Sequence, residues 1–282
     1  KKKDLKKKKI THEINSNIEK ISRVIDSQKQ INFLHSGHLG DLINSLPVIK
    51  EISKKSKCNL FINLNKKINE QDVNNLHPSK NYFLTLNSYN KLLPLLKKQS
   101  YLTEINIFKE EFIDVDLDYF RELPINFNID SVRWYSHLTG TNPDLSEPYI
   151  INIDENNKFK NCIILMRSLR RQNEHLNFNF LEKYQNLLFI GLNDEFLNLK
   201  KQVKNLEFYD CKNFLEMAQI IKSCKLFIGN LSFGYTIAEG LKKPRLLESY
   251  LDFPLVYPNG KLAHEFYFQN HFEKYVKNLA GS

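Results

Sequence analysis

The stretch KLFIGNLSFGYTIAEGLKKPRLLE, residues 225–248, gives the clearest indication of how this chain folds. It begins with a short apolar run that ends in Gly-Asn. A loop with a serine and a glycine then leads into helical spacing and a second apolar run. Short apolar runs bounded by glycine or proline predict buried strands. A strand, a helix and another strand in this order predict one unit of a parallel sheet with a helix on its face.

The same alternation continues along the chain on both sides of this stretch. Apolar runs that predict strands lie at 31–36, 58–64, 81–86, 104–109, 161–168, 184–192, 205–210, 225–230 and 244–249. Helical spacing predicts helices at 14–25, 41–55, 89–99, 130–140, 213–224 and 232–244. A turn-rich stretch with two prolines, at 141–150, separates two such series. We therefore predict the α/β class, with two Rossmann-like, doubly wound domains that face a cleft.

The expected domain boundaries follow from this division. Residues 1–20 are expected to form a basic, flexible leader, 21–150 the N-terminal domain, and 151–262 the C-terminal domain. Residues 263–282 are expected to form a helix that packs back on the N-terminal domain. A chain of 282 residues is long enough for two domains, each with its own core.

The positive charge of the chain is concentrated at its beginning. The net charge is +9, and the first nine residues, KKKDLKKKK, contain seven lysines and one aspartate, so they carry two thirds of it. We interpret this leader as a solvated tail, with peripheral contact to an anionic membrane surface as the alternative. No basic stripe interleaved with aromatic residues follows, so nucleic acid is not an expected partner. No apolar run of 18 residues predicts a membrane-spanning helix.

The cysteines indicate neither a zinc site nor a disulfide framework. There are four, and none forms a Cys-x-x-Cys pair; they are Cys58, Cys162, Cys211 and Cys224. Each lies in or beside an apolar stretch, where a reduced cysteine packs as a small hydrophobic residue. We therefore expect a cytoplasmic protein.

A second loop that contains glycines lies in HSGHLGDLINSLPVIKEI, residues 35–52. Gly37 and Gly40 stand between a strand and an amphipathic helix, where the backbone could closely approach a ligand at the helix N-terminus. Asp41 follows at the start of the helix, a position at which aspartate commonly serves as an N-cap. The pattern is neither the dinucleotide fingerprint nor a P-loop.

Together the two loops resemble a known family. A strand that ends in IGN, a Ser-Gly loop and a helix that ends before a proline resemble the ADP-heptose lipopolysaccharide heptosyltransferase-like glycosyltransferases. GHLGDLINSLPVIKEI resembles the N-terminal signature of that family. The resemblance implies the GT-B fold, with an N-terminal acceptor domain and a C-terminal domain for a nucleotide-diphosphate sugar. Leu231 and Thr236 stand where the family usually has aspartate and histidine, so the donor sugar stays open.

The resemblance also implies a chemical role for the first loop. It places Asp41 as the general base that takes the proton of a hydroxyl group of a saccharide, glycan or glycolipid acceptor. His38 and His35 compete for this role because imidazole titrates near neutral pH. A satisfied loop histidine and a capping aspartate remain the simpler interpretations of these residues.

The second domain is expected to bind the donor. Arginines in MRSLRRQN follow its first strand, and guanidinium groups can bind diphosphate oxygens bidentately. We favour Arg167 and Arg170, and give Arg171 equal weight as a solvated residue. Glu239 could accept hydrogen bonds from ribose, or could pair with Lys242 or Lys243. The complete set of expected donor-binding residues is Gly37, Gly40, Arg167, Arg170, Gly191, Asn230, Ser232, Phe233, Gly234 and Glu239.

A rival motif, DVDLD at 114–118, has the Asp-x-Asp spacing that could hold Mg²⁺ or Mn²⁺ on a diphosphate. We favour a solvated turn or an acceptor contact here, and therefore predict metal-independent transfer with no cofactor. Two alternatives stay open: a nucleotide-sugar epimerase of the same fold, and a protein that binds nucleotide sugars without catalysis.

Overall fold

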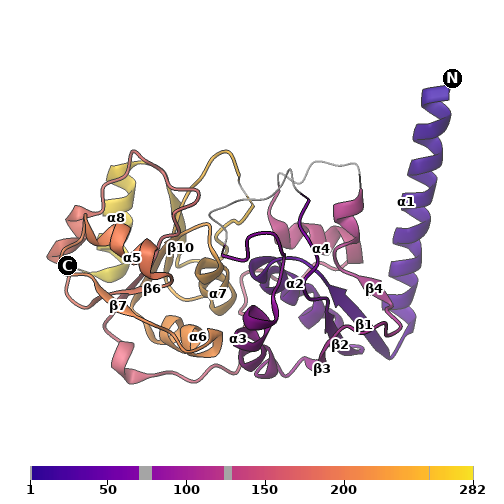
Figure 1. The fold of residues 1–282 in the computed structure, drawn as a ribbon, viewed down its shortest axis with the longest axis horizontal. Coiled ribbons are helices and arrows are strands. Elements are labelled where there is room, and N and C mark those ends of the chain that lie inside the picture. The colour runs from indigo at the N-terminus through magenta and orange to yellow at the C-terminus, as the bar shows by residue number, and fades with distance from the viewer. Residues whose placement is uncertain (1, 70–77, 124–128, 254, 282) are drawn as a thin grey trace.

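The computed structural model describes residues 2–69, 78–123, 129–253 and 255–281. Its strands form two parallel sheets, one in each half of the chain (Figure 1). The N-terminal sheet has the order β3-β2-β1-β4, with β1 (Gln30–His35), β2 (Lys57–Ile62), β3 (Leu102–Ile107) and β4 (Val115–Asp116). The C-terminal sheet has the order β10-β9-β8-β5-β6-β7, with β5 (Ile163–Met166), β6 (Leu187–Ile190), β7 (Glu207–Tyr209), β8 (Leu226–Asn230), β9 (Arg245–Glu248) and β10 (Ala263–Phe266). The predicted α/β class with two doubly wound units is confirmed.

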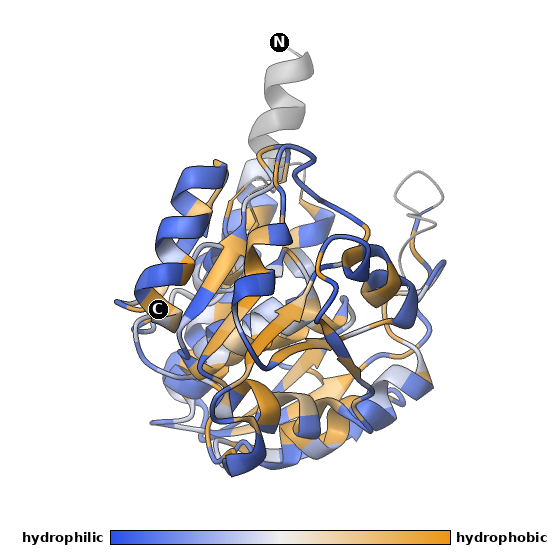
Figure 2. Cartoon of the chain, turned by 90° about the vertical axis from the view of Figure 1, so that its left-hand side faces the viewer, coloured by the Kyte–Doolittle hydropathy of each residue, from blue (hydrophilic) through white to orange (hydrophobic). Residues whose placement is uncertain are grey.

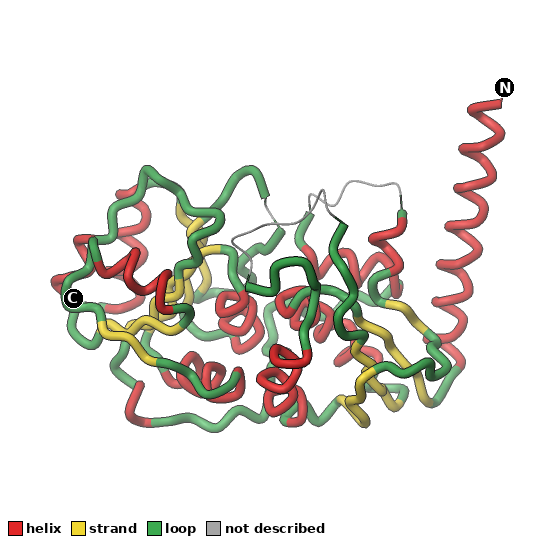
Figure 3. The backbone as a smooth tube through the Cα atoms, viewed as in Figure 1, coloured by secondary structure: helices red, strands yellow, loops and turns green. Residues whose placement is uncertain are grey.

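Helices surround both sheets (Figure 3). The α-helices are α1 (Lys2–Ser27), α2 (Leu39–Ile52), α3 (Leu86–Lys97), α4 (Ser131–Thr139), α5 (Asn193–Lys200), α6 (Phe214–Ser223), α7 (Phe233–Leu241) and α8 (Gln269–Ala280). The 3₁₀ turns include η2 (Tyr119–Glu122), η3 (Asn157–Phe159) and η4 (Asn179–Lys183). Side-chain caps explain where several helices begin: Thr85 caps α3, Asp130 caps α4 and Asn213 caps α6.

Apolar residues are concentrated in the strands and in the helices beside them (Figure 2), and their side chains form two buried clusters. One core cluster is continuous from Phe33 of β1 through Leu46 of α2 to Ile237 of α7, and so joins the two halves of the chain. A second cluster covers the other face of the C-terminal sheet. Ile163 belongs to that second cluster and Ile164 to the first, because successive side chains of a strand point to opposite faces.

Two expected elements are wrong. Residues 81–86 do not form a strand, because Thr85 accepts the N–H of Ser88 and starts α3. Residues 263–266 form β10, and the helix that follows packs in the C-terminal domain rather than on the N-terminal one. Its Phe272 stacks on Phe266, 4.0 Å between ring centroids.

The basic leader belongs to α1, which extends through the expected boundary at residue 20. The N-terminal part of α1 stands away from the rest of the molecule (Figure 3), and Ile18, Ile21 and Val24 pack its later turns on the core. Within the described residues, no helix combines the length and the apolar character needed to cross a membrane.

Candidate active site

Most of the expected site residues lie on loops at two equivalent places in the sheets. The order of the strands reverses between β1 and β4 in the N-terminal sheet, and between β5 and β8 in the C-terminal sheet. Open α/β sheets bind ligands at such switch points, outside the carboxyl ends of the strands. The loop after β1 contains Gly37 and His38, and the loop after β5 contains Arg170 and Arg171.

The two switch points come together because helices α2 and α7 meet at the junction of the two halves. A Cβ atom placed on Gly40, in the first turn of α2, would lie 3.6 Å from Cγ2 of Thr236, in the first turn of α7. The N-termini of both helices therefore lie near each other. Each one adds partial positive charge to this region.

Asp41 is the third residue of α2, and its carboxylate is held on one side only. Oδ2 accepts the backbone N–H of His38 at 3.1 Å and a bond from Nη2 of Arg121 at 2.7 Å. Oδ1 accepts no hydrogen bond from any residue that the structure describes. One oxygen is thus fixed by the protein, while the other can take a proton. His38, rather than Asp41, occupies the N-cap position.

The surroundings of Asp41 and His38 keep the first charged and the second neutral. Burial raises the pKa of Asp41, but the charge of Arg121, with smaller electrostatic contributions from His38 and His35, outweighs it and holds the pKa below its ordinary value. Burial lowers the pKa of His38, and Asp41 offsets this only in part. Nδ1 of His38 lies 3.1 Å from the carbonyl oxygen of Phe83, which can only accept, so Nδ1 carries the proton.

The arginine that holds Asp41 is itself anchored by a buried aspartate. Nε of Arg121 donates to Oδ1 of Asp118 at 2.8 Å, and Oδ2 of Asp118 accepts the backbone N–H of Ser36. Nδ1 of His35 lies 3.7 Å from the same carboxylate, and its Nε2 lies 3.1 Å from the hydroxyl of Tyr135. A chain of contacts thus leads from Asp41 into the core.

Gly37 makes room for this network. A Cβ atom there would lie 3.0 Å from Nη2 of Arg121, from Oδ1 of Asp118 and from Cε1 of His35. The sequence predicted that this glycine lets the backbone approach a ligand closely. Instead the protein's own side chains fill the space, and the positive-φ glycines described do not include it. Gly40 likewise has an ordinary neighbour in Thr236.

The DVDLD motif is part of the scaffold. Asp114 accepts the N–H of Asn32 at 2.8 Å, and Asp116 accepts the N–H of Asp118 at 2.9 Å. Because the side chain of Asp118 is only 1% exposed, the prediction of a solvated turn is wrong for this residue. No group of three or more His, Cys, Asp or Glu side chains in the described part of the chain is arranged to hold a metal ion.

On the opposite side of the junction, two arginines have no carboxylate partner among the described residues. Arg170 and Arg171 are half-buried, and neither forms an ion pair with a residue that the structure describes. Burial and the charge of Arg170 lower the pKa of Arg171 to about 10, and burial lowers that of Arg170 although Glu195 opposes it. The guanidinium carbon of Arg171 lies 4.1 Å from the ring centroid of Phe253. Two uncompensated positive charges in such a place favour an anion.

These arginines face the first loop. The charge of Arg170 lowers the pKa of His38, and the charge of Asp41 raises that of Arg171. Both interactions cross from one half of the chain to the other. The structure therefore brings the expected base and two guanidinium groups into one region.

Arg167 has a different role from the expected one. Its Nε and Nη2 atoms donate to both carboxylate oxygens of Glu248, at 2.6 and 2.7 Å, and it stacks on Phe178 at 4.6 Å. The guanidinium is buried and already neutralised, so it does not offer the free charge that a diphosphate needs. Asn230 also supports the loop: its amide bonds the backbone N–H and C=O of Ser168, both at 2.9 Å.

The N-terminus of α7 has no side-chain cap among the described residues. Ser232 occupies the N-cap position without a side-chain cap, and its hydroxyl donates to the carbonyl of Asn230 at 3.1 Å. Phe233 packs against Phe214, 4.5 Å between ring centroids. A Cβ atom on Gly234 would clash with Sδ of Met166, so this glycine lets α7 pack on the end of β5.

Two more expected donor residues serve the scaffold in this structure. Glu239 pairs with Lys242 and accepts from Nε of Arg245 at 2.5 Å, so pairing with Lys242, the simpler of its two interpretations, is confirmed. Gly191, after β6, has a φ of 143°, which favours glycine. Beside it Glu195 is buried, and burial raises its pKa to about 7.

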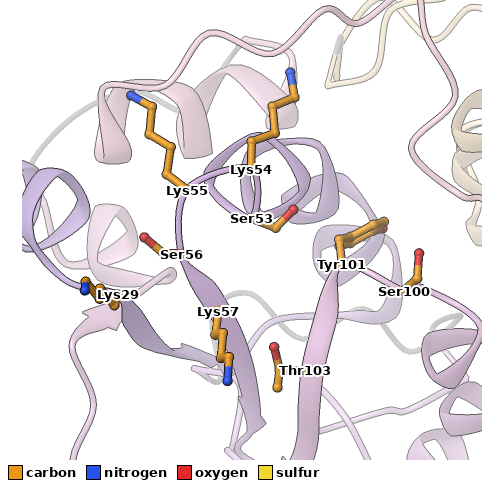
Figure 4. Close-up of a pocket in the computed structure, with 9 residues that line it drawn as sticks. All are labelled: Lys29, Ser53, Lys54, Lys55, Ser56, Lys57, Ser100, Tyr101 and Thr103. Atoms are coloured by element: carbon orange, nitrogen blue, oxygen red, sulfur yellow. The ribbon is translucent and has the colours of Figure 1, made fainter.

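A lysine-lined groove lies at the opposite edge of the N-terminal sheet. It contacts the amino ends of the strands and is lined by Lys29, Ser53, Lys54, Lys55, Ser56, Lys57, Ser100, Tyr101 and Thr103. Figure 4 shows the four lysine side chains pointing away from one another. Because they do not converge, and because parallel sheets bind ligands at the other edge, we do not place the site here.

The fold resembles solved glycosyltransferases. ADP-heptose LPS heptosyltransferase II of E. coli matches with a TM-score of 0.55 and 11% identity over 89% of this chain and 98% of that one. E. coli heptosyltransferase WaaC with ADP gives 0.54 and 10% over 88% and 99%. A family 9 glycosyltransferase from Veillonella parvula gives 0.52 and 11% over 90% and 89%. At such identities the likeness shows the fold, and it confirms the predicted GT-B architecture. No protein-family model and no curated protein matches the sequence.

Proposed function

We propose that this protein is a glycosyltransferase that moves a sugar from a nucleotide-diphosphate donor to a saccharide, glycan or glycolipid acceptor. The observation that carries the proposal is the arrangement at the junction. Among the described residues Arg170 and Arg171 form no ion pair, and their charges act across the junction, that of Arg170 on His38 and that of Arg171 with Asp41. Oδ1 of Asp41 accepts no hydrogen bond from any of these residues. The two guanidinium groups suit a diphosphate, and Oδ1 of Asp41 suits the proton of a hydroxyl group.

Each step of the transfer has a candidate group. Oδ1 of Asp41 takes the proton of the acceptor hydroxyl as the acceptor oxygen bonds to the anomeric carbon. The bond from that carbon to the diphosphate breaks, and its electron pair stays on the leaving oxygen. Arg170, Arg171 and the N-terminus of α7, which lacks a side-chain cap, stabilise the negative charge that develops there. Because the protein supplies this charge, we expect turnover to persist in EDTA.

Adenine nucleotides are the first ligands to test. Solved structures of E. coli WaaC were determined with ADP and with ADP-2-deoxy-2-fluoro heptose. Leu231 is buried here and the hydroxyl of Thr236 donates to the carbonyl of Phe233, so these positions offer no charge to a sugar. We therefore propose no donor sugar.

Titration calorimetry with ADP, UDP and GDP tests the donor site. Replacement of Arg170 or Arg171 by alanine should weaken the preferred nucleotide by about 10- to 100-fold, the usual worth of a charge-assisted bond. Arg133→Ala, at an exposed arginine of α4, is the matched control and should leave affinity unchanged. Unaltered affinity in both site variants would refute this donor site.

Slow hydrolysis of the bound donor separates an active transferase from a protein that only binds. A transferase slowly transfers the sugar of its donor to water, and so releases nucleoside diphosphate at a measurable rate. A non-catalytic binding protein leaves the nucleotide sugar intact.

A further inference from the structure

We infer that Arg121 positions the Asp41 carboxylate for catalysis, and that Asp118 and Gly37 hold Arg121 in place. The inference rests on the proposed role of Asp41 as the base. No residue pattern in the sequence singled out Arg121, which lies in η2 directly after the DVDLD motif. Its importance follows from the contacts that it makes.

The guanidinium of Arg121 joins two elements of the N-terminal domain. Nη2 bonds Asp41 of α2 at 2.7 Å, and Nε bonds Asp118 after β4 at 2.8 Å. The two bonds use different nitrogens, so the planar group is fixed in orientation as well as in position. A lysine could not reproduce both bonds, because its ammonium group is a single point of charge.

Packing keeps the guanidinium in this place. Its carbon lies 5.1 Å from the ring centroid of Phe120 and 5.6 Å from that of Phe83. Phe83 also packs against His38, 4.9 Å between ring centroids. On the remaining side Gly37 has no side chain, and a methyl group there would lie 3.0 Å from Nη2. The absence of a side chain at Gly37 therefore leaves room for Arg121 to reach Asp41.

The two oxygens of the Asp41 carboxylate therefore have different roles. Oδ2 is occupied by Arg121 and by the N–H of His38, so the group cannot rotate without losing both bonds. Oδ1 remains for the acceptor. Asp118 could not take over this role, because it is buried and both of its oxygens are already bonded.

The charge of Arg121 also sets the protonation of Asp41. Burial raises the pKa of this carboxyl, and Arg121 is the strongest influence that lowers it. The other titratable groups that act on Asp41 must be included in any test. They are His38, His35, Asp118, Arg171 and Tyr135.

The test is an NMR titration of the protein with ¹³C-labelled aspartate carboxyl groups, which needs no substrate. Asp41→Asn identifies the resonance of Asp41. In Arg121→Gln the titration midpoint of Asp41 should move upward, while Arg133→Gln should leave it in place. Lost packing alone would lower the melting temperature without moving this midpoint.

A second pair of variants, at Gly37 and Gly40, tests the contact between Arg121 and Asp41 without changing either residue. Gly37→Ala should push Arg121 away and raise the midpoint of Asp41, whereas Gly40→Ala should not, because its Cβ meets only an ordinary contact. If Arg121→Gln fails to fold, Gly37→Ala and Arg121→Lys carry the test. In Arg121→Lys the midpoint should rise less, since a charge remains. An unchanged midpoint in every folded variant would overturn the inference.

The turnover of Asp41→Asn separates this inference from the proposed function. If that variant is fully active, Asp41 is not the base, and the proposed role fails even where Arg121 governs the Asp41 carboxylate. If Asp41→Asn is inactive but the titration midpoint of Asp41 is the same in the Arg121 variants as in the wild type, Asp41 remains the proposed base and the inference about Arg121 fails.

Discussion

The two switch points contain similar residues in opposite electrostatic states. In the N-terminal half, Arg121 is paired with Asp41 and Asp118, so its charge is compensated within the protein. In the C-terminal half, Arg170 and Arg171 lack such partners among the described residues, and their pKa values are lowered. The comparison teaches that residue type at a switch point does not define a ligand site. The state of pairing does, because only an uncompensated charge gains from a bound anion.

The largest expected effect is on turnover, and it tests Asp41, the carboxylate that is paired with Arg121. Asp41→Asn should fold, because asparagine can still accept the N–H of His38, but turnover should fall by about 10²- to 10⁴-fold. The measurement is the rate of nucleoside diphosphate release from the donor that binds, together with nucleotide affinity and melting temperature. Full activity in the asparagine variant would reduce Asp41 to a structural residue and make His38 the next candidate base.

The next effect contrasts two arginines of the same loop. Arg167→Ala removes one partner of a buried ion pair and should destabilise the fold by about 3–5 kcal/mol. Arg170→Ala removes an unpaired charge and should change stability little while weakening nucleotide binding. Chemical denaturation and calorimetry on both variants measure the difference. Equal losses of stability would show that pairing does not distinguish the two residues.

A smaller effect is the pH dependence of stability around Glu195. Its pKa is raised in the folded state to about 7, above the unfolded value, so the folded protein binds more protons between these values. Its contribution therefore becomes unfavourable as pH rises from 4.5 through 7, by up to about 3 kcal/mol. Glu195→Gln should match the wild type near pH 4.5 and exceed it at pH 8.

Thermal denaturation across pH measures this effect, with the exposed Glu174→Gln as control. The pH dependence of stability that comes from Asp41 and Asp118 has the opposite sign. The pKa values of Asp41 and Asp118 are lowered, so their contribution is present above the unfolded pKa and disappears as pH falls through the folded one. A Glu195→Gln variant that follows the wild type at every pH would contradict the raised pKa of this buried carboxyl.

Local patterns were sufficient to predict the fold. The strand at 225–230, the helix after Ser232 and the strand at 244–249 occur close to where apolar runs and glycine placed them. The segment at 81–86 was misassigned because a threonine cap competes with a short apolar run. The last helix was misplaced because its apolar positions do not say which sheet they will cover.

The site could be predicted in part. Sequence placed Arg170 after a strand and Asp41 and Ser232 at the starts of helices, where the structure also has them, because strand ends and helix starts are local features. It favoured Arg167 over Arg171 as a ligand of the diphosphate, because the pairing of Arg167 with Glu248, which is distant in the sequence, leaves no local signal. It also missed Arg121, whose one local signal is its spacing of three residues from Asp118.

The most direct test of the central claim is a structure of the protein with ADP bound. We predict that the diphosphate oxygens lie within hydrogen-bonding distance of Arg170 or Arg171 and of the first N–H groups of α7, while Arg167 stays on Glu248. A diphosphate that instead displaces Glu248 from Arg167, or that binds in the lysine-lined groove, would contradict the account.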